Sequence, residues 1–323
     1  MASLVETGLE CVIKNIDTFG LLVSPTSGMP TPASNTQIRT IWLSKSLLKW
    51  KELFIRAVIR IVGFKNITVL IDDFLNILNI LVTAQQGWFD DRIYHYAYNY
   101  VQYKLYQTPE WKQTLQKSQG VRQNRRIQEI SQLLGNFKLP ATANYLDVGC
   151  SEGSITSTLG HYFNLSNQNI HGCDVTQVHE SSESWNFKLI TDETLPYDSN
   201  SMEFISVFMA LHHIRDPANS LKEIHRILKP GGMLLVREHD AGEPEMGLVL
   251  DLLHGFYSMV WPVYSVEPGQ IPEPELESFK DHYSHYRSRQ QWNTIITSQG
   301  FKLAAESNVQ SAWRYYYDVY QKN

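Results

Sequence analysis

The sequence has few cysteines and no long apolar run that is free of charge. Its three cysteines, Cys11, Cys150 and Cys173, lie far apart and form no Cys-x-x-Cys pair. Such spacing is typical of a reducing compartment and offers neither a disulfide framework nor a structural metal site. We therefore expect a cytoplasmic protein without disulfide bonds and without a structural metal.

The chain also lacks the patterns of secretion and of membrane insertion. Its first residues have no basic segment followed by an apolar one, so no secretory signal is expected. The most apolar stretch, residues 53–82, includes Arg56, Arg60, Asp72 and Asp73. These charges exclude a helix that crosses hydrocarbon, and we expect no membrane span.

Charge is divided unevenly along the chain. Residues 1–140 contain 16 Lys and Arg against 10 Asp and Glu, whereas residues 141–323 contain 12 against 23. The first part is therefore basic and the second acidic. A basic front part is compatible with a polyanionic partner, although a solvated surface explains it equally well.

Three regions differ in pattern. Residues 1–39 include a stretch rich in Pro, Ser, Thr and Gly and are expected to be mobile or irregular. Residues 40–139 space their apolar side chains at three and four positions, and they predict a mainly helical cap or substrate module. Six tyrosines crowd residues 94–106 of this region, where they either pack within the cap or stack on bases.

From residue 140 to residue 323, apolar runs alternate with helical segments. Strands are predicted at 144–149, 169–175, 187–191, 202–211 and 231–240, and helices at 154–163 and 217–232. This alternation predicts a doubly wound α/β fold with a parallel sheet. The ligand of such a sheet binds at the carboxyl ends of the strands.

The segment LDVGCSEGS, residues 146–154, falls at the first of these carboxyl ends. Gly149 and Gly153 permit a tight turn and a close approach of the following helix, whose amino end supplies free N–H groups. The dinucleotide fingerprint is absent, because Ser151 stands where another glycine would be. Taken alone, the turn fits a cofactor site and a structural loop equally well.

Acidic residues follow three successive predicted strands. Asp147 lies at the tip of the first, Asp174 closes the second, and Asp192 and Glu193 follow the third. A carboxylate at the end of the second strand is the usual partner of ribose hydroxyls in doubly wound folds. Together these acids predict a pocket for a nucleoside with a cationic or hydrogen-bond-donating tail.

The segments LDVGCSEG, GCDV, LITDETLPYDSNSMEFISV and ALHHIRDPANSLKEIHRILKPGGMLLV resemble the class I S-adenosylmethionine-dependent methyltransferases, in the broad group with the ubiquinone-biosynthesis type of core. The resemblance covers residues 140–240 closely and extends less specifically to residue 323. It implies a Rossmann-like seven-stranded sheet whose last two strands form an edge hairpin, here FKLAAES and WRYYYDVYQ. It does not account for the helical region before residue 140.

The resemblance also implies which residues contact S-adenosylmethionine. The methionine part would lie against Asp147 and the turn Gly149–Ser151–Gly153, and the ribose against Asp174. The adenine would lie against Asp192 and Glu193. Phe208 and Met209 would line the cofactor after the fourth strand.

Methyl transfer needs a base only where the acceptor must lose a proton. The candidates are His239 and Glu238 in the run Arg237–Glu238–His239–Asp240 at the tip of the fifth strand. The alternative interpretation of this run is an internally paired salt-bridge cluster that shapes the loop. His212 and His213, after the fourth strand, are interpreted as structural.

Three functions stay open at this point. The first is methyl transfer to a small-molecule or otherwise undetermined acceptor. The second is an RNA methyltransferase of the cap-guanine type, favoured by the basic, tyrosine-rich front and by FMALHH. The run LLVREHDAGEPE is also similar to methyltransferase-like proteins of large DNA viruses, which suits either function. The third is a non-catalytic subunit with the methyltransferase fold and a protein partner, which the acids at 147, 174 and 192 disfavour.

Overall fold

The computed structural model describes residues 123–176, 185–191, 194–242, 246, 250, 285–308 and 314–323. All of them belong to one of two compact units of the chain, formed by Gln116–Leu250 and Tyr283–Asn323. The predicted irregular segment 1–39 lies outside the described residues, and so does the predicted helical module 40–139 except for residues 123–139. That domain division stays a prediction.

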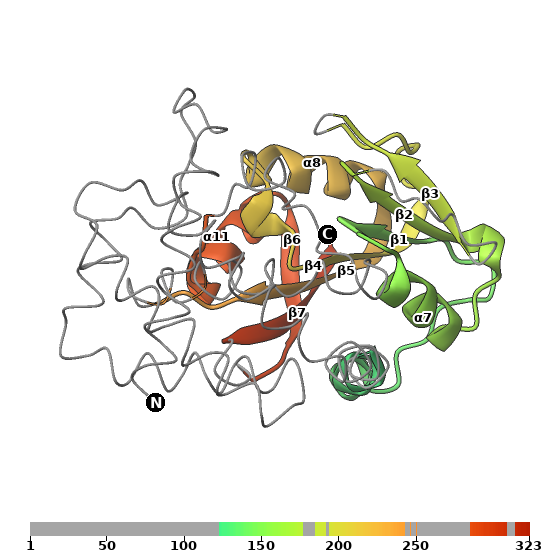
Figure 1. The fold of residues 1–323 in the computed structure, drawn as a ribbon, viewed down its shortest axis with the longest axis horizontal. Helices are drawn as coiled ribbons and strands as arrows, with labels where there is room; N and C mark the ends of the chain where they lie inside the picture. The colour runs from blue at the N-terminus through green and yellow to red at the C-terminus, as the bar shows by residue number, and fades with distance from the viewer. Residues whose placement is uncertain are drawn as a thin grey trace, which may run out of the picture. The chain divides into compact units, whose positions relative to one another are not determined.

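The described unit is a seven-stranded sheet with helices on both faces (Figure 1). The strand order is β3-β2-β1-β4-β5-β7-β6. The strands are β1 (Tyr145–Val148), β2 (Ile170–Asp174), β3 (Asn186–Leu189), β4 (Met202–Phe208), β5 (Leu228–His239), β6 (Phe301–Glu306) and β7 (Tyr315–Lys322). The helices are α7 (Ser154–Tyr162), α8 (Pro217–Ile227) and α11 (Arg289–Ser298), with 3₁₀ turns η1 (Asn167–Asn169) and η2 (Leu211–His213).

Strands β1 to β5 are parallel, while β7 runs antiparallel to both β5 and β6. The sheet is therefore mixed: its parallel part and its edge hairpin are both as expected, and the predicted seven-stranded Rossmann-like α/β fold is confirmed. The parallel arrangement brings the carboxyl ends of β1, β2, β4 and β5 to one edge.

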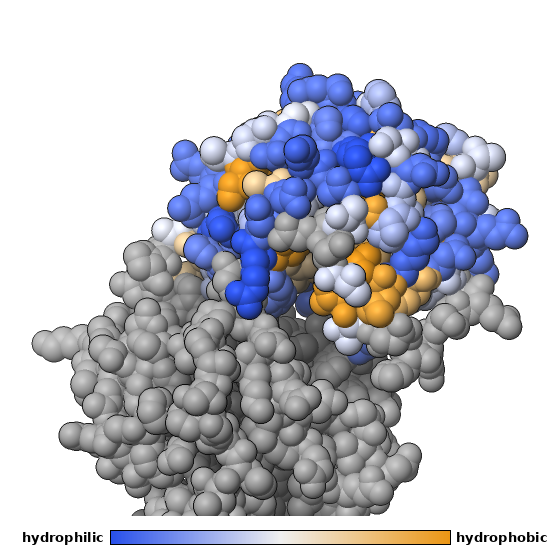
Figure 2. Space-filling view, turned by 90° about the horizontal axis from the view of Figure 1, so that it is seen from above, coloured by the Kyte–Doolittle hydropathy of each residue, from blue (hydrophilic) through white to orange (hydrophobic). Residues whose placement is uncertain are grey.

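Helices α8 and α11 pack in one layer, and α7 lies on the opposite face of the sheet (Figure 1). A helical segment at 123–134 also packs on the sheet, where the Tyr315 hydroxyl donates a hydrogen bond to Glu129 Oε1 at 2.8 Å. Figure 2, which views the α8 side, shows a mainly hydrophilic surface with small apolar groups among the described residues. No described helix combines the length and apolar character that crossing a membrane requires.

Helices α8 and α11 begin at capping residues that are recognisable in the sequence. Asp216 caps α8 by accepting a hydrogen bond from the Asn219 N–H at 3.1 Å. Ser288 and Gln291 form the capping box of α11, as their spacing predicts. The boundary after α8 differs from prediction, because residues 228–232 already belong to β5. Pro230 explains the difference, since a proline disfavours helical backbone at the residue before it.

Candidate active site

The turn after β1 adopts a left-handed backbone at three alternate residues. The φ angles are +73° at Gly149, +48° at Ser151 and +71° at Gly153. The N–H groups of Gly149 and Cys150 both donate to the carbonyl of Cys173 in β2, at 2.8 and 3.1 Å. The turn is therefore fixed to the neighbouring strand, and Ser151 occupies a conformation that usually requires glycine.

Glycine is needed at two of these positions because other groups approach closely. A Cβ atom on Gly149 would lie 2.6 Å from Cβ of Ala210, and one on Gly153 would lie 1.9 Å from the Trp185 ring. The sequence predicted a close approach at Gly153, but between the strand and its helix. The group that enforces glycine there is the buried Trp185, which precedes β3 and which the motif did not reveal.

Asp174, at the tip of β2, reaches this turn. Its Oδ2 accepts a hydrogen bond from the Ser151 N–H at 2.8 Å, and its Oδ1 accepts one from the Thr176 N–H at 3.0 Å. The acid and the glycine turn thus lie side by side at the carboxyl edge of the sheet. This juxtaposition is the one that the spacing of the two motifs predicts.

Asp147 lies deeper in the fold than Asp174. It is 1% exposed, and its two oxygens accept hydrogen bonds from Thr156 Oγ1 at 2.6 Å and Ser206 Oγ at 2.5 Å. Burial raises its pKa to about 6, while the two hydroxyl groups lower it. Its carboxylate thus joins β1, β4 and α7, and a direct contact with the cofactor stays a prediction.

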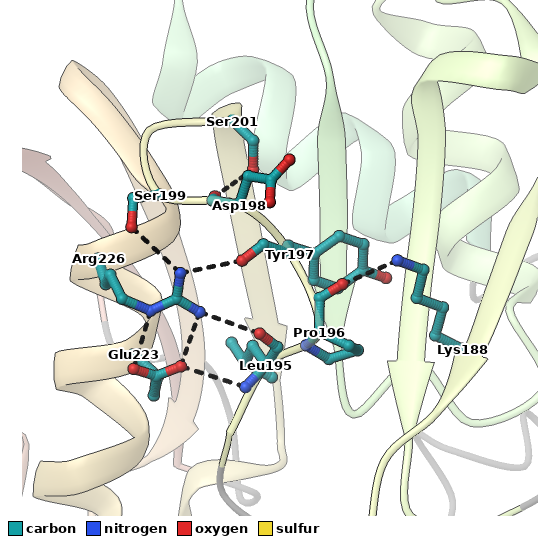
Figure 3. A network of polar contacts seen from close by, with 9 residues as sticks. All are labelled: Lys188, Leu195, Pro196, Tyr197, Asp198, Ser199, Ser201, Glu223 and Arg226. Atoms are coloured by element: carbon teal, nitrogen blue, oxygen red, sulfur yellow. Dashed lines mark hydrogen bonds and ion pairs between the residues drawn. The ribbon is translucent and has the colours of Figure 1, made fainter.

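Asp192 and Glu193 lie outside the described residues, but the segment that follows them is held by a polar network (Figure 3). Arg226 of α8 donates to the carbonyls of Leu195 and Tyr197 at 3.0 and 2.9 Å and pairs with Glu223 at 2.8 Å. Lys188 of β3 lies 4.3 Å from the centre of the Tyr197 ring. Helix α8 and strand β3 together fix this segment, which leads from the predicted adenine residues to the start of β4.

Phe208 and Met209 stand where β4 ends. Met209 has a φ of +56° and donates its N–H to the carbonyl of Arg237 in β5 at 2.8 Å. A left-handed backbone at a residue with a long side chain costs about 1–2 kcal/mol. Strained backbone is concentrated at functional sites. Here the strained residue lies where the chain turns at the end of β4, next to β5. Their contact with the cofactor stays a prediction.

Among the described residues, the two acids of the polar run at the tip of β5 form their ion pairs with residues outside the run, which differs from an internally paired salt-bridge cluster. Glu238 pairs with His212 of η2, and Asp240 pairs with Arg314 at 2.7 Å. The guanidinium of Arg237 stacks on the Tyr315 ring. Adjacent side chains on a strand point to opposite faces, so Glu238 points away from the face on which Arg237 and His239 lie.

Glu238 is completely buried and ties the loop after β4 to β5. Its Oε2 lies 2.7 Å from His212 Nδ1, and it accepts hydrogen bonds from the backbone N–H groups of His212 and His239 at 3.3 and 3.1 Å. Burial raises the pKa of Glu238 to about 7, and the backbone N–H of His239 and the charge of His213 lower it. His212 is also fully buried, which agrees with its structural interpretation.

His239 is 1% exposed and lies among aromatic rings. Its ring centre is 5.5 Å from that of His212 and 6.0 Å from that of Tyr286. The backbone N–H of His285 donates to the carbonyl of His212 at 2.8 Å, so a distant segment joins this cluster. The structure therefore brings His239, Glu238 and His212 together at the carboxyl edge. The described residues contain no group of three or more His, Cys, Asp and Glu side chains arranged to hold a metal ion.

Comparison with known proteins extends these observations. The family described as a methyltransferase domain matches residues 119–306, more than half of the chain. A demethylmenaquinone methyltransferase of Staphylococcus epidermidis is 27% identical over 164 residues, which cover 48% of this chain and 66% of that protein. The ubiquinone/menaquinone biosynthesis C-methyltransferase UbiE of Pseudoalteromonas translucida is 30% identical over 122 residues, which cover 36% of this chain and 45% of that protein.

Among solved structures, a SAM-dependent methyltransferase from Methanosarcina mazei is similar at a TM-score of 0.40 and 19% identity, covering 57% of this chain and 94% of that one. The chain spans just under two thirds of the length of the first curated relative and less than half of the second. Because the family match extends over more than half of its length, the chain belongs to the methyltransferase-domain family, the class I S-adenosylmethionine-dependent methyltransferases.

Proposed function

We propose that the protein transfers the methyl group of S-adenosylmethionine to a small-molecule acceptor at the carboxyl edge of its sheet. Membership of the methyltransferase-domain family supports the reaction. The names of the two curated relatives refer to demethylmenaquinone and to ubiquinone and menaquinone biosynthesis, which supports a small organic acceptor. The identity of that acceptor is open.

The observation that carries the proposal is the contact of Asp174 with the left-handed turn after β1. A carboxylate that already accepts a backbone N–H at 2.8 Å is held at the place where ribose hydroxyls bind in doubly wound sheets. The N–H groups at the start of α7 add positive potential beside it. The donor set therefore fits a nucleoside cofactor with ribose hydroxyls and a charged tail.

The residues that we expect to hold the cofactor are Gly149, Ser151 and Gly153 of the turn, Asp174, and Phe208 with Met209. Asp192 and Glu193 stay predictions for the adenine. When bound, S-adenosylmethionine supplies an activated methyl group, so the protein contributes mainly alignment and the exclusion of water. We expect the strained Met209 and the buried end of β5 to contribute to that alignment.

We propose His239 as the proton acceptor and Glu238 as the residue that positions it. Glu238 accepts the backbone N–H of His239 and pairs with His212, and this geometry holds the tip of β5 against the loop after β4. Because Glu238 is fully buried and its oxygens are engaged, it acts through these neighbours. An acceptor that needs no deprotonation would make His239 dispensable.

The two alternatives gain no support from the described residues or from the two curated relatives. An RNA acceptor depended on the basic, tyrosine-rich region before residue 123, which lies outside the described residues. A non-catalytic subunit is disfavoured by the intact contact of Asp174 with the turn. The cytoplasmic location also stays a prediction, supported by the free thiols of Cys150 and Cys173.

The test offers tritiated S-adenosylmethionine and the full chain to a metabolite extract, to capped RNA and to total protein. We expect label in the metabolite fraction, and its loss with heat-inactivated protein. Label confined to RNA would replace the small-molecule acceptor with the RNA alternative. Absence of label from every fraction, together with absence of binding to S-adenosylhomocysteine, would contradict methyl transfer itself.

A further inference from the structure

Arg237 is a buried cation near the proposed acceptor site. It pairs in register with Phe208 of β4 and with Tyr317 of β7, and it is only 8% exposed. A guanidinium stays charged at every pH at which proteins fold, so this burial places a permanent positive charge inside the fold. Such a charge is costly to bury unless other groups compensate it.

The guanidinium points toward the carboxyl end of β5. Its Cζ lies 4.3 Å from the centre of the Tyr315 ring and 5.6 Å from that of Tyr317. Tyr315 pairs with His239, two residues beyond Arg237 along the strand. The side chain therefore extends toward the edge of the sheet where the acceptor is expected.

The tyrosine rings stabilise the charge but cannot satisfy its hydrogen bonds. Arg237 Nε is buried and has no acceptor among the described residues, and no described carboxylate forms an ion pair with this side chain. Stacking on aromatic faces offsets part of the cost of burying the charge. It leaves the buried Nε–H without an acceptor among the described residues, and a guanidinium N–H matches the oxygens of a carboxylate or phosphate.

A second buried donor lies beside it. The hydroxyl of Tyr317 has no hydrogen-bond partner among the described residues, although Tyr317 is 1% exposed. Burial raises the pKa of Tyr317 to about 12, even though the charge of Arg237 lowers it, so the phenol keeps its proton. Two buried hydrogen-bond donors, Arg237 Nε–H and the Tyr317 hydroxyl, thus lack partners among the described residues. They belong to residues that pair across the adjacent strands β5 and β7.

Further charged residues lie on the neighbouring helical segment. Arg125 and Arg126 are on the segment 123–134 that packs on this face, where Glu129 accepts a hydrogen bond from the Tyr315 hydroxyl and pairs with Arg125 at 3.9 Å. The Phe208 ring lies 6.4 Å from the Tyr317 ring, which joins the end of β4 to this pair through aromatic groups. An aromatic contact therefore links the end of β4 to one of the two donors.

We infer that Arg237 and Tyr317 form an oxyanion-binding subsite for the acceptor, which is a small molecule bearing a carboxylate or a phosphate on an apolar body. The inference rests on the proposed function, because it identifies the chemical class of that acceptor. One buried guanidinium with one hydroxyl suits a single anionic group, whereas an RNA backbone requires an exposed row of cations.

The test measures binding of benzoate, phenyl phosphate and the neutral analogue benzamide to the full chain saturated with S-adenosylhomocysteine. We expect at least one anionic probe to bind about tenfold more tightly than benzamide, and the comparison of the two anions distinguishes carboxylate from phosphate. Arg237→Leu should abolish this preference. Tyr317→Phe should weaken it severalfold, and Arg237→Lys should retain part of it.

The matched control is Tyr316→Phe. Tyr316 is the next residue on β7, and its buried hydroxyl also lacks a partner among the described residues, but it faces the other side of the sheet. This variant should bind all three probes as the wild type does. Should Arg237→Leu fail to fold, Arg237→Lys and Tyr317→Phe still decide the question.

An unchanged preference for anions in Arg237→Lys and Tyr317→Phe, or equal binding of benzoate, phenyl phosphate and benzamide to the wild type, would overturn the inference. S-adenosylhomocysteine that binds normally in those experiments would leave the proposed function intact. Its failure to bind the wild type would instead contradict the proposed function. A capped RNA that binds through Arg237 while neither small anion binds would overturn the small-molecule class.

Discussion

Replacing Glu238 with glutamine removes a carboxyl group whose pKa burial raises from 4.5 to about 7. In the unfolded chain the Glu238 carboxyl group ionises as the pH rises above 4.5. In the folded protein it ionises only near pH 7. Ionisation therefore favours the unfolded state. The stability that the neutral group provides is fully present below pH 4.5 and is lost progressively up to pH 7.

The two pKa values give the size of this loss. Each unit of difference corresponds to about 1.4 kcal/mol, so Glu238 should lower the free energy of unfolding by roughly 2–3 kcal/mol between pH 5 and pH 8. Asp147, whose pKa is raised from 3.8 to about 6, acts in the same direction but mostly below pH 6. The interval from pH 6 to pH 8 therefore isolates Glu238, with a loss of about 1 kcal/mol.

Urea unfolding at pH 5, 6, 7 and 8 measures this effect. The wild type should lose stability as pH rises, and Glu238→Gln should lose less by the amounts given above. Asp198→Asn, which removes an exposed carboxyl group, should follow the wild type. Identical pH profiles for the wild type and Glu238→Gln would refute the reasoning.

Three further substitutions, one of them with a matched control variant, test other parts of the account. Ser151→Gly should raise the free energy of unfolding by about 0.5–1 kcal/mol, because relief of the left-handed backbone exceeds the entropic cost of glycine; a loss on urea unfolding would contradict this. Arg226→Met should lower the free energy of unfolding by about 2 kcal/mol, because its charged hydrogen bonds are lost. The control Lys222→Met, at an exposed position on the same helix, should change the free energy of unfolding by less than about 0.5 kcal/mol. Equal losses of stability in Arg226→Met and Lys222→Met would contradict a stabilising role of the Arg226 hydrogen bonds. His239→Ala should reduce single-turnover methylation by about 10²–10⁴ without weakening cofactor binding; a rate within a few-fold of wild type would exclude it as the base.

The local parts of the fold were predictable because their causes lie within a few residues. The caps at Asp216 and Ser288, the glycine turn and the buried runs of the parallel strands all follow from short patterns. The edge hairpin formed by β6 and β7 was expected from the family resemblance and is confirmed. The helical pattern extends to residue 232, but α8 ends at Ile227, because Pro230 disfavours helical backbone at the residue before it.

The partners of the polar residues were not predictable, because they come from distant parts of the chain. Asp147 meets Ser206, which lies 59 residues further on, and Glu238 meets His212, 26 residues before it. Trp185 fixes the need for glycine at position 153 across the sheet. Periodicity identifies the face on which a side chain lies, but only the packed fold shows which residue it meets.

The central claim is that Asp174 and the turn after β1 bind S-adenosylmethionine, and calorimetry with S-adenosylhomocysteine tests it most directly. The wild type should bind, and Asp174→Ala should bind about 1.5–3 kcal/mol more weakly, the cost of removing a charged hydrogen-bond acceptor. Asp198→Ala should bind as the wild type does. A wild type that does not bind, or an Asp174→Ala variant with unchanged affinity, would contradict the account.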